Sequence, residues 1–152
     1  MPENLFVYGS LLRGRRNHGL LEHARFLGEA VAYDVGLYAV TPYFPGAVPE
    51  KGKAVRGELY EISLELLLYI DKLEDNGKLY RRRLWPVVLV ETGEKIIAWL
   101  YFWLRPVRRE TAIPLEEQPW EPRPRRNTRT DTYFVEKCSK GGKIGERGEL
   151  RQ

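Results

Sequence analysis

The stretch Ser63-Leu-Glu-Leu-Leu-Leu-Tyr-Ile-Asp-Lys-Leu-Glu74 has the strongest helical pattern in the sequence. The Ser63 hydroxyl can accept a hydrogen bond from a free backbone N–H group of the first turn. Glu65 adds a favourable charge at the positive end of the helix dipole. The side chains that recur at helical spacing, and so predict the face that meets the core, are Leu66, Leu67, Ile70 and Leu73.

Glu74 is the residue of this helix that points to chemistry. It follows Ile70 by four positions and Leu67 by seven, so a continuous helix places it on the apolar face. Burial and the negative end of the helix dipole both disfavour a carboxylate there and predict a raised pKa. Such a carboxyl group can exchange protons near neutral pH. Asp71 and Asp75 fall on other faces and are predicted to be solvated.

The periodicity leaves one alternative open. The helix can instead end at Leu73, with Asn76-Gly77 as its stop signal, and Glu74 can then extend into water. In that case Glu74 is an ordinary surface carboxylate with no role in proton transfer.

The first strand predicts a second part of the site. Residues 5–8, Leu-Phe-Val-Tyr, are apolar β-formers, and Gly9-Ser10 ends them in a tight turn. Free backbone N–H groups at such a turn suit a carboxylate or a developing oxyanion, and glycine permits close approach. A plain strand-ending turn is the alternative. The arginines of residues 13–16 either attract an anion or belong to a solvated loop.

The remaining pattern predicts an α+β domain. Residues 17–26 are expected to form a short helix capped by Asn17, and His18 and His23 are interpreted as structural. Residues 41–46 are expected to form a loop whose aromatic side chains could line a pocket, although such residues more often simply cover the end of a barrel. The segments with strand character are 26–33, 35–40, 53–62, 79–90 and 95–104. Many strands with two or so short helices favour a small mixed sheet curled into a barrel.

Composition excludes several classes of protein. A hydrophobic content of 43% with 30% charged residues is typical of a soluble globular protein, and no apolar run is long enough to span a membrane. The single cysteine, Cys138, excludes an internal disulfide framework, and the absence of a signal-peptide pattern favours the cytoplasm. With so few histidine and cysteine side chains, we expect no zinc site.

The charge of +4 is unevenly placed. Residues 1–104 contain equal numbers of basic and acidic residues, so the whole excess lies in residues 105–152. We therefore expect a neutral domain over 1–104 that does not bind nucleic acid. Residues 105–152 are interpreted as a basic, Pro-rich extension packed on that domain or trailing from it. Within it, Trp120 is a candidate anchor and residues 130–135 a candidate short strand.

Six short segments, taken in order, resemble the γ-glutamylcyclotransferase-like family. This family includes γ-glutamylamine cyclotransferases and the plant avirulence-induced-gene-like proteins. The resemblance covers about residues 4–104 and implies a small mixed α+β barrel. The segments that carry it are Leu5-Phe-Val-Tyr-Gly-Ser-Leu11, Asn17-His18, Phe26-Leu-Gly28, Gly57-Glu-Leu-Tyr60, Ile70-Asp-Lys-Leu-Glu74 and Tyr80-Arg81-Arg82.

The resemblance also implies a role for individual residues. It identifies the loop Tyr8-Gly9-Ser10-Leu11 with the part of the family's site that holds the glutamyl group. Glu74 corresponds to the catalytic acid/base, and Tyr80 to a tyrosine close to the site. Two departures bear on substrate choice: Asp75-Asn-Gly77 follows the glutamate where the family usually has glycine, and residues 105–152 extend beyond the usual domain.

The function implied is release of 5-oxoproline and a free amine from a small-molecule γ-glutamyl amine or γ-glutamyl peptide. No cofactor, metal or membrane is required, and the sequence specifies neither the leaving amine nor an oligomeric state. Two alternatives stay open. One is a non-catalytic protein of the same fold that binds a small molecule or a peptide end. The other is a nucleic-acid-associated protein that uses residues 81–83 and the basic extension.

Overall fold

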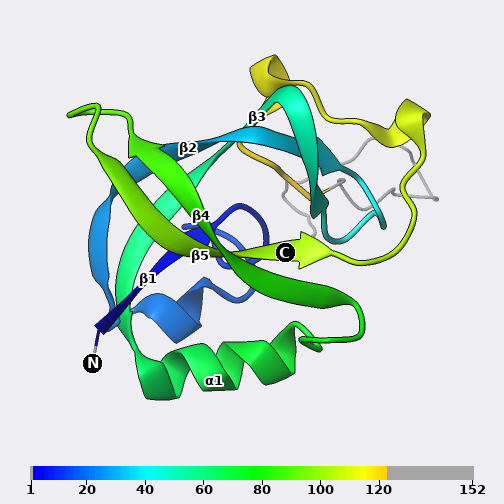
Figure 1. The fold of residues 1–152 in the computed structure, drawn as a ribbon. Helices are drawn as coiled ribbons and strands as arrows, with labels where there is room; N and C mark the ends of the chain where they lie inside the picture. The colour runs from blue at the N-terminus through cyan, green and yellow to red at the C-terminus, as the bar shows by residue number, and fades with distance from the viewer. Residues whose placement is uncertain (1, 123–152) are drawn as a thin grey trace, which may run out of the picture. The chain divides into compact units, whose positions relative to one another are not determined.

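Five strands form one closed barrel in the computed structural model, which describes residues 2–122 (Figure 1). The order around the barrel is β1-β3-β2-β4-β5. The strands are β1 (Pro2–Val7), β2 (Arg25–Tyr38), β3 (Gly46–Ser63), β4 (Tyr80–Leu89) and β5 (Lys95–Trp103). The predicted α+β class and the curled sheet are confirmed.

The barrel is closed by its first and last strands. β1 lies parallel to β5 with Leu5 opposite Trp99, whereas all other neighbouring strands are antiparallel. Residues 26–33 and 35–40, predicted as two strands, are parts of the single strand β2. The pairing of β2 with β3 shifts between Tyr33 and Val35, where Asp34 has a positive φ of 62°. This local irregularity interrupts the alternation in the sequence but not the strand.

Helix α1 (Leu64–Leu73) follows β3 directly and lies across one end of the barrel (Figure 1). The Ser63 side chain accepts a hydrogen bond from the Leu66 N–H group at 3.1 Å, so the predicted cap is confirmed. Leu67 and Ile70 are buried against the barrel. Leu73 is 44% exposed, and its predicted place in the core is wrong because the chain turns away at this last helical residue.

Asp71 is a second correction on α1. Its carboxylate accepts hydrogen bonds from Arg82 Nε at 2.7 Å, from Arg82 Nη2 at 3.1 Å and from the Tyr101 hydroxyl at 2.5 Å. The expectation that Asp71 is solvated is therefore wrong, because β4 and β5 present polar partners to this face of the helix. The salt bridge with Asp71 makes Arg82 the ion-paired member of residues 81–83. The Arg82 guanidinium also lies over the Trp99 ring.

The predicted helix over residues 17–26 is also wrong. Only the 3-10 helix η1 (His18–Leu21) forms, and Asn17 makes no capping hydrogen bond. The Asn17 amide instead donates to Ser10 Oγ at 2.9 Å, so it ties this segment to the turn after β1. His18 Nδ1 lies 2.9 Å from the Leu11 carbonyl oxygen, which agrees with a structural role for this histidine.

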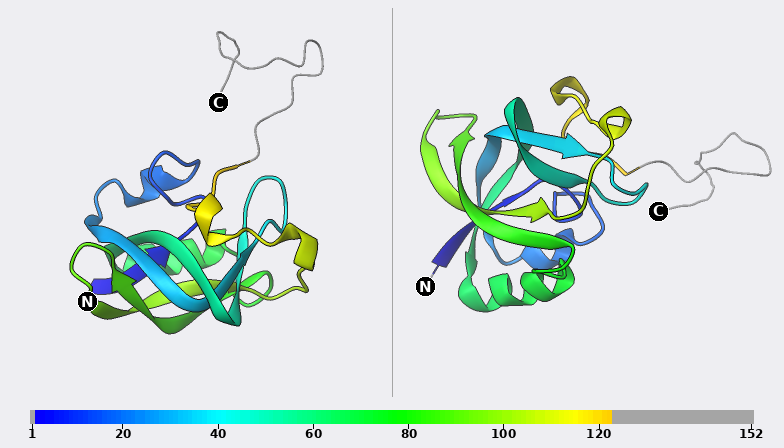
Figure 2. Two further views of the ribbon diagram at one scale, coloured as in Figure 1. Left: turned by 90° about the horizontal axis from the view of Figure 1, so that it is seen from above. Right: turned by 45° about the vertical axis from the view of Figure 1, so that its right-hand side comes forward.

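Residues 105–122 run along the barrel through the 3-10 helices η2 (Arg109–Thr111) and η3 (Leu115–Glu117), coloured yellow in Figure 2. Gln118 is buried, and its side-chain oxygen accepts from the Arg56 N–H group at 2.8 Å. Trp120 is 5% exposed and packs into the barrel core, so its predicted anchoring role is confirmed. Residues 130–135 and Cys138 lie outside the described residues, and the boundary at 104/105 stays a prediction.

Over the described range of the chain, none of the helices has the length and apolar character needed to cross a membrane.

Candidate active site

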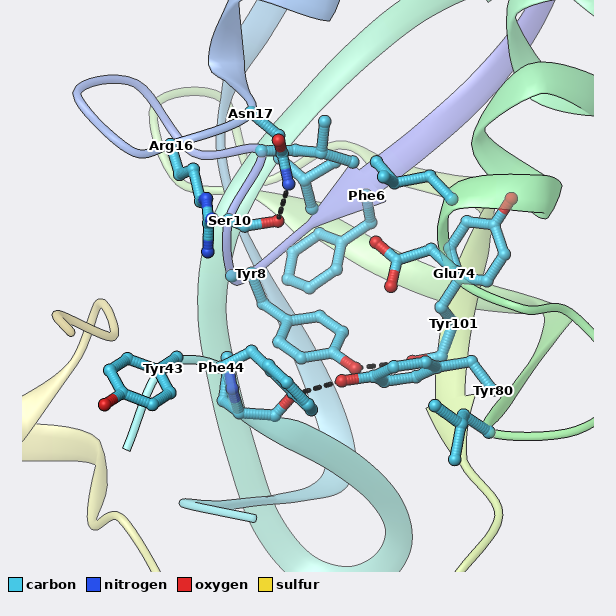
Figure 3. A pocket seen from close by; sticks show the side chains of 16 residues that line it. Phe6, Tyr8, Ser10, Arg16, Asn17, Tyr43, Phe44, Glu74, Tyr80 and Tyr101 are labelled. Carbon is cyan, nitrogen blue, oxygen red and sulfur yellow. Dashed lines mark hydrogen bonds between the residues drawn. The ribbon is translucent and has the colours of Figure 1, made fainter. Parts of the chain in front are cut away.

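A pocket of about 200 Å³ opens between the turn after β1, the end of α1 and the loop before β3 (Figure 3). It is smaller than the roughly 300–1,000 Å³ typical of sites for drug-sized ligands, so its size suits a small metabolite. Its lining residues are Phe6, Val7, Tyr8, Gly9, Ser10, Leu11, Arg16, Asn17, Tyr43, Phe44, Pro45, Leu73, Glu74, Leu79, Tyr80 and Tyr101.

Glu74 supplies the carboxyl group of this pocket. It is the C-cap residue of α1, and its backbone N–H group donates to the Ile70 carbonyl oxygen at 2.8 Å. The helix therefore ends at Leu73, as the alternative interpretation required. The side chain nevertheless points into the pocket and not into bulk water (Figure 3).

Burial alone raises the pKa of Glu74 to about 7. None of the salt bridges found in residues 2–122 involves this carboxylate, and no cation lowers its pKa. A carboxyl group with this pKa is present in comparable amounts of acid and base at neutral pH. It can therefore accept a proton and return it without a large free-energy difference between the two forms.

Two tyrosine side chains beside Glu74 form hydrogen bonds to the backbone that surrounds the pocket. The Tyr8 hydroxyl donates to the Tyr101 carbonyl oxygen at 2.7 Å and accepts from the Ala47 N–H group at 3.2 Å. The Tyr80 hydroxyl donates to the Pro45 carbonyl oxygen at 2.7 Å. Burial, and to a smaller extent the charge of Glu74, raises the pKa of both phenols. Both therefore stay protonated and fix the backbone around the pocket.

The turn after β1 presents unused donors. Within residues 2–122, no backbone acceptor pairs with the N–H groups of Gly9, Ser10 or Leu11. A Cβ atom at Gly9 would lie 3.1 Å from Pro45 Cδ, so a side chain there would press on the loop before β3. Ser10 keeps its hydroxyl proton free to donate, because its oxygen accepts from Asn17. These donors can receive a carboxylate or an oxyanion.

The three arginines of the following loop have different environments. Arg13 donates from its backbone N–H group and its Nε atom to Glu58, at 3.0 and 3.2 Å. Arg15 donates to the Trp120 carbonyl oxygen at 2.8 Å. Arg16 lines the pocket, and no acidic partner for it occurs within the described residues. Arg16 is therefore the cation of this loop that is available to a ligand.

No group of three or more His, Cys, Asp or Glu residues within residues 2–122 is arranged to hold a metal ion.

The sequence profile of the family described as "Gamma-glutamyl cyclotransferase, AIG2-like" matches residues 5–122. The chain belongs to this family. The predicted resemblance, made on about residues 4–104, is therefore confirmed, and the match continues through the segment that carries Gln118 and Trp120.

Several known proteins are similar to this chain over most of their own length. The Escherichia coli K12 gamma-glutamylcyclotransferase family protein YtfP is 37% identical over 103 residues, which are 68% of this chain and 84% of the relative. The crystal structure of an AIG2-like protein from Mus musculus has a TM-score of 0.67 and 28% identity, and the match covers 83% of this chain and 98% of the mouse chain. A Pyrococcus horikoshii protein structure has a TM-score of 0.58 and 32% identity, over 76% and 87% of the two chains.

In this gamma-glutamyl cyclotransferase family member, the residues predicted for the site lie around one pocket. They come from three parts of the chain: Tyr8-Gly9-Ser10-Leu11, Glu74 and Tyr80. Their proximity is a property of the structure, whereas their roles in substrate binding and catalysis stay predictions.

Several lining residues were not predicted individually. Tyr101 lies in an apolar strand, where alternation alone does not separate a pocket residue from a core residue. Phe44 and Tyr43 belong to the aromatic loop for which a pocket wall and a cover over one end of the barrel were both open interpretations, and they line the pocket. Arg16 was one of three equivalent arginines, and only the partners of Arg13 and Arg15 distinguish it.

Proposed function

We propose that this protein is a γ-glutamyl cyclotransferase that releases 5-oxoproline and a free amine from a small γ-glutamyl amine or γ-glutamyl peptide. The observation that carries the proposal is the position of Glu74, a half-buried carboxyl group with a pKa of about 7 that faces the turn of residues 9–11. Family membership supports the same reaction class.

The substrate carries its own nucleophile. Its α-amine attacks the γ-carbonyl carbon and closes a five-membered lactam, while the bond from that carbon to the leaving nitrogen breaks. Because the attack is intramolecular, holding the reactive conformer is the main task of the pocket. Well-aligned intramolecular attack corresponds to effective molarities of roughly 10⁵–10⁸ M.

The proton balance assigns Glu74 its role. The α-ammonium group loses two protons to become the lactam N–H, and the leaving nitrogen gains two to depart as an ammonium ion. Glu74 accepts each proton from the amine and passes it to the leaving nitrogen, so it ends the reaction in its starting form. General acid–base catalysis of this kind contributes roughly 10²–10⁴-fold to the rate.

The free N–H groups at Gly9, Ser10 and Leu11 are assigned to the negative charge of the substrate. They bind either the α-carboxylate or the oxyanion that develops on the γ-carbonyl oxygen. Tyr8 and Tyr80 take no part in proton transfer in this proposal, because their hydroxyl groups already donate to backbone carbonyl groups. They shape the walls.

The substitution Glu74→Gln tests the proposal. It keeps the size of the side chain but removes its ability to carry protons. We expect 5-oxoproline release to fall by about 10²–10⁴-fold. Binding of the γ-glutamyl compound, measured by isothermal titration calorimetry, should change little.

The control is Glu65→Gln, which removes an exposed carboxylate from the first turn of the same helix. Its activity should match that of the unsubstituted protein. If the unsubstituted protein releases no 5-oxoproline from any member of a panel of γ-glutamyl amines and peptides, the catalytic proposal is overturned. Binding without turnover would then favour a non-catalytic protein of the same fold.

A further inference from the structure

Arg16 stands apart from the charged residues near the pocket. It lines the pocket and is exposed, whereas its neighbour Arg15 is held by Trp120 and Arg13 by Glu58. Among the described residues no carboxylate pairs with Arg16. A guanidinium group that faces a pocket without an acidic partner is suited to a carboxylate on a ligand.

The backbone that carries Arg16 is fixed from both sides. The hydrogen bonds of Arg13 and Arg15 hold the residues before it, and the bond from Asn17 to Ser10 holds the residue after it. These contacts hold the loop against the barrel, so the Arg16 side chain starts from a fixed position at the pocket.

Arg16 is not the partner of Glu74. Burial is the cause of the raised pKa of Glu74, and no cation in the described part of the chain opposes it. In Figure 3, Arg16 and Glu74 lie on opposite sides of Tyr8 and Ser10. The pocket therefore has a proton-exchanging carboxyl group on one side and a free positive charge on the other.

We propose that Arg16 is a specificity-determining residue that binds a carboxylate carried by the leaving amine, so that the preferred substrates are γ-glutamyl derivatives of amino acids rather than of uncharged amines. This inference rests on the proposed function and assigns its substrate class.

We assign Arg16 to the leaving half of the substrate because Arg16 lies on the solvent-exposed side of the pocket. The reacting carbonyl group and α-amine must reach hydrogen-bonding distance of Glu74, which is half-buried. The small cavity then holds the glutamyl half, and the leaving half extends towards the solvent-exposed side. Arg16 and Tyr43, which is 68% exposed, lie on that side. An anionic group on the leaving half would therefore meet Arg16.

The test compares two substrates that differ only in the carboxylate. They are γ-glutamyl-L-alanine and γ-glutamylethylamide, with kcat/KM for 5-oxoproline release measured for the unsubstituted protein and for Arg16→Gln. The ratio of kcat/KM values, alanine derivative over ethylamide, should fall by up to about fivefold in Arg16→Gln, as expected for an exposed ion pair. Comparing ratios cancels the different intrinsic reactivities of the two amines.

Arg25→Gln is the matched control, because Arg25 is an exposed arginine outside the pocket that pairs with Glu61. Its ratio should equal that of the unsubstituted protein. An unchanged ratio in Arg16→Gln overturns the inference. An equal loss for both substrates also overturns it, because Arg16 would then act on the glutamyl half or on the fold.

Binding separates this inference from the proposed function. In a Glu74→Gln background, the dissociation constants of both compounds are measured by calorimetry with and without Arg16→Gln. If Arg16→Gln weakens binding of the alanine derivative more than binding of the ethylamide, the role of Arg16 is supported even if the unsubstituted protein shows no turnover. If Arg16→Gln changes the dissociation constants of the two compounds by the same factor in the Glu74→Gln background, the role of Arg16 is overturned, whether or not 5-oxoproline is released.

Discussion

Among residues 2–122, no cation compensates the charge of the Glu74 carboxylate. Burial raises its pKa from 4.5 to about 7, so the ionised form is less favourable in the folded protein than in the unfolded chain. Tyr8 and Tyr80, which also line the pocket, remain neutral and do not offset the negative charge of Glu74. The stability of the protein must therefore depend on the ionisation of this one group.

We expect the ionisation of Glu74 to lower stability as the pH rises. Below about pH 4.5 the carboxyl group is protonated in both states. Between about pH 4.5 and 7 the unfolded chain releases the proton first, so the free energy of unfolding falls, and above about pH 7 it is constant. The total contribution is about 3 kcal/mol, because each pKa unit corresponds to about 1.4 kcal/mol. The measurement is urea unfolding from pH 5 to pH 8.5.

Glu74→Gln isolates this contribution, because other carboxyl groups titrate equally in both proteins. The variant should become more stable than the unsubstituted protein as the pH rises to 7, with a constant difference above that. A difference that does not change with pH would contradict the assigned pKa. In the same range, kcat/KM of the unsubstituted protein should rise to a plateau above about pH 7, since the base is the ionised form.

The position of Glu74 could be predicted from the sequence, but its conformation could not. Spacing from Leu67 and Ile70 correctly placed it near the apolar side of the helix. Whether a residue at a helix end turns into a pocket depends on what surrounds it, here the turn after β1 and the loop before β3. Arg16 was unpredictable for the same reason, since only tertiary partners distinguish it from Arg13 and Arg15.

Helix α1 is joined to the barrel by a polar network as well as by apolar packing. Asp71 accepts from Arg82 of β4 and from the Tyr101 hydroxyl of β5, and the carbonyl group of Tyr101 accepts from Tyr8. The side chains of Asp71 and Arg82 are 14% and 18% exposed. The network therefore connects the helix that presents Glu74 to Tyr8 and Tyr101, which line the pocket.

We expect Asp71→Asn to destabilise the protein by about 1–3 kcal/mol. The amide cannot accept all three hydrogen bonds, and it leaves the Arg82 guanidinium without its charge partner. The measurement is urea unfolding at pH 7.

Asp75→Asn is the matched control, since Asp75 is exposed and has a positive φ of 53° that asparagine also tolerates. Its effect should stay below about 0.5 kcal/mol. Equal effects of the two substitutions would show that the Asp71 network does not stabilise the fold.

Elements whose structure depends on local sequence pattern could be predicted, whereas elements whose structure depends on contacts with distant residues could not. For helix α1, the Ser63 cap and the buried positions Leu67 and Ile70 were predicted correctly, whereas the predicted burial of Leu73 was wrong. The segment 17–26 has a capping residue, but the Asn17 side chain bonds to Ser10 instead, and only one 3-10 turn forms. The polar contact of Asp71 was missed because spacing within a helix gives no information about partners on other strands.

At the scale of the molecule, the segment of residues 105–122 completes the barrel core. Trp120 inserts its ring among core residues, and Gln118 bonds to the backbone of Arg56. The sequence indicated an appendage with Trp120 as its anchor, and composition could not show that this segment supplies a core side chain. The barrel itself followed from the strand pattern and the family resemblance.

Trp120→Ala should destabilise the protein by about 3–5 kcal/mol, because it removes a buried aromatic ring and leaves a cavity. Thermal unfolding followed by circular dichroism measures the loss. Leu115→Ala, in the same segment but 44% exposed, is the control and should cost less than about 1 kcal/mol. Similar effects of the two substitutions would contradict the anchoring role.

The parallel contact of β1 with β5 also sets the order in which the site can be assembled during synthesis. The turn that offers its N–H groups is made first, near the N-terminus, yet its strand has a parallel neighbour only when residues 95–103 have been added. A nascent chain that already contains Tyr8, Glu74 and Tyr80 still lacks Tyr101, whose carbonyl group anchors Tyr8. A chain that stops before β5 therefore lacks one lining residue of the pocket and the acceptor that holds the Tyr8 hydroxyl, so we expect the complete pocket to form only after β5 has been synthesised.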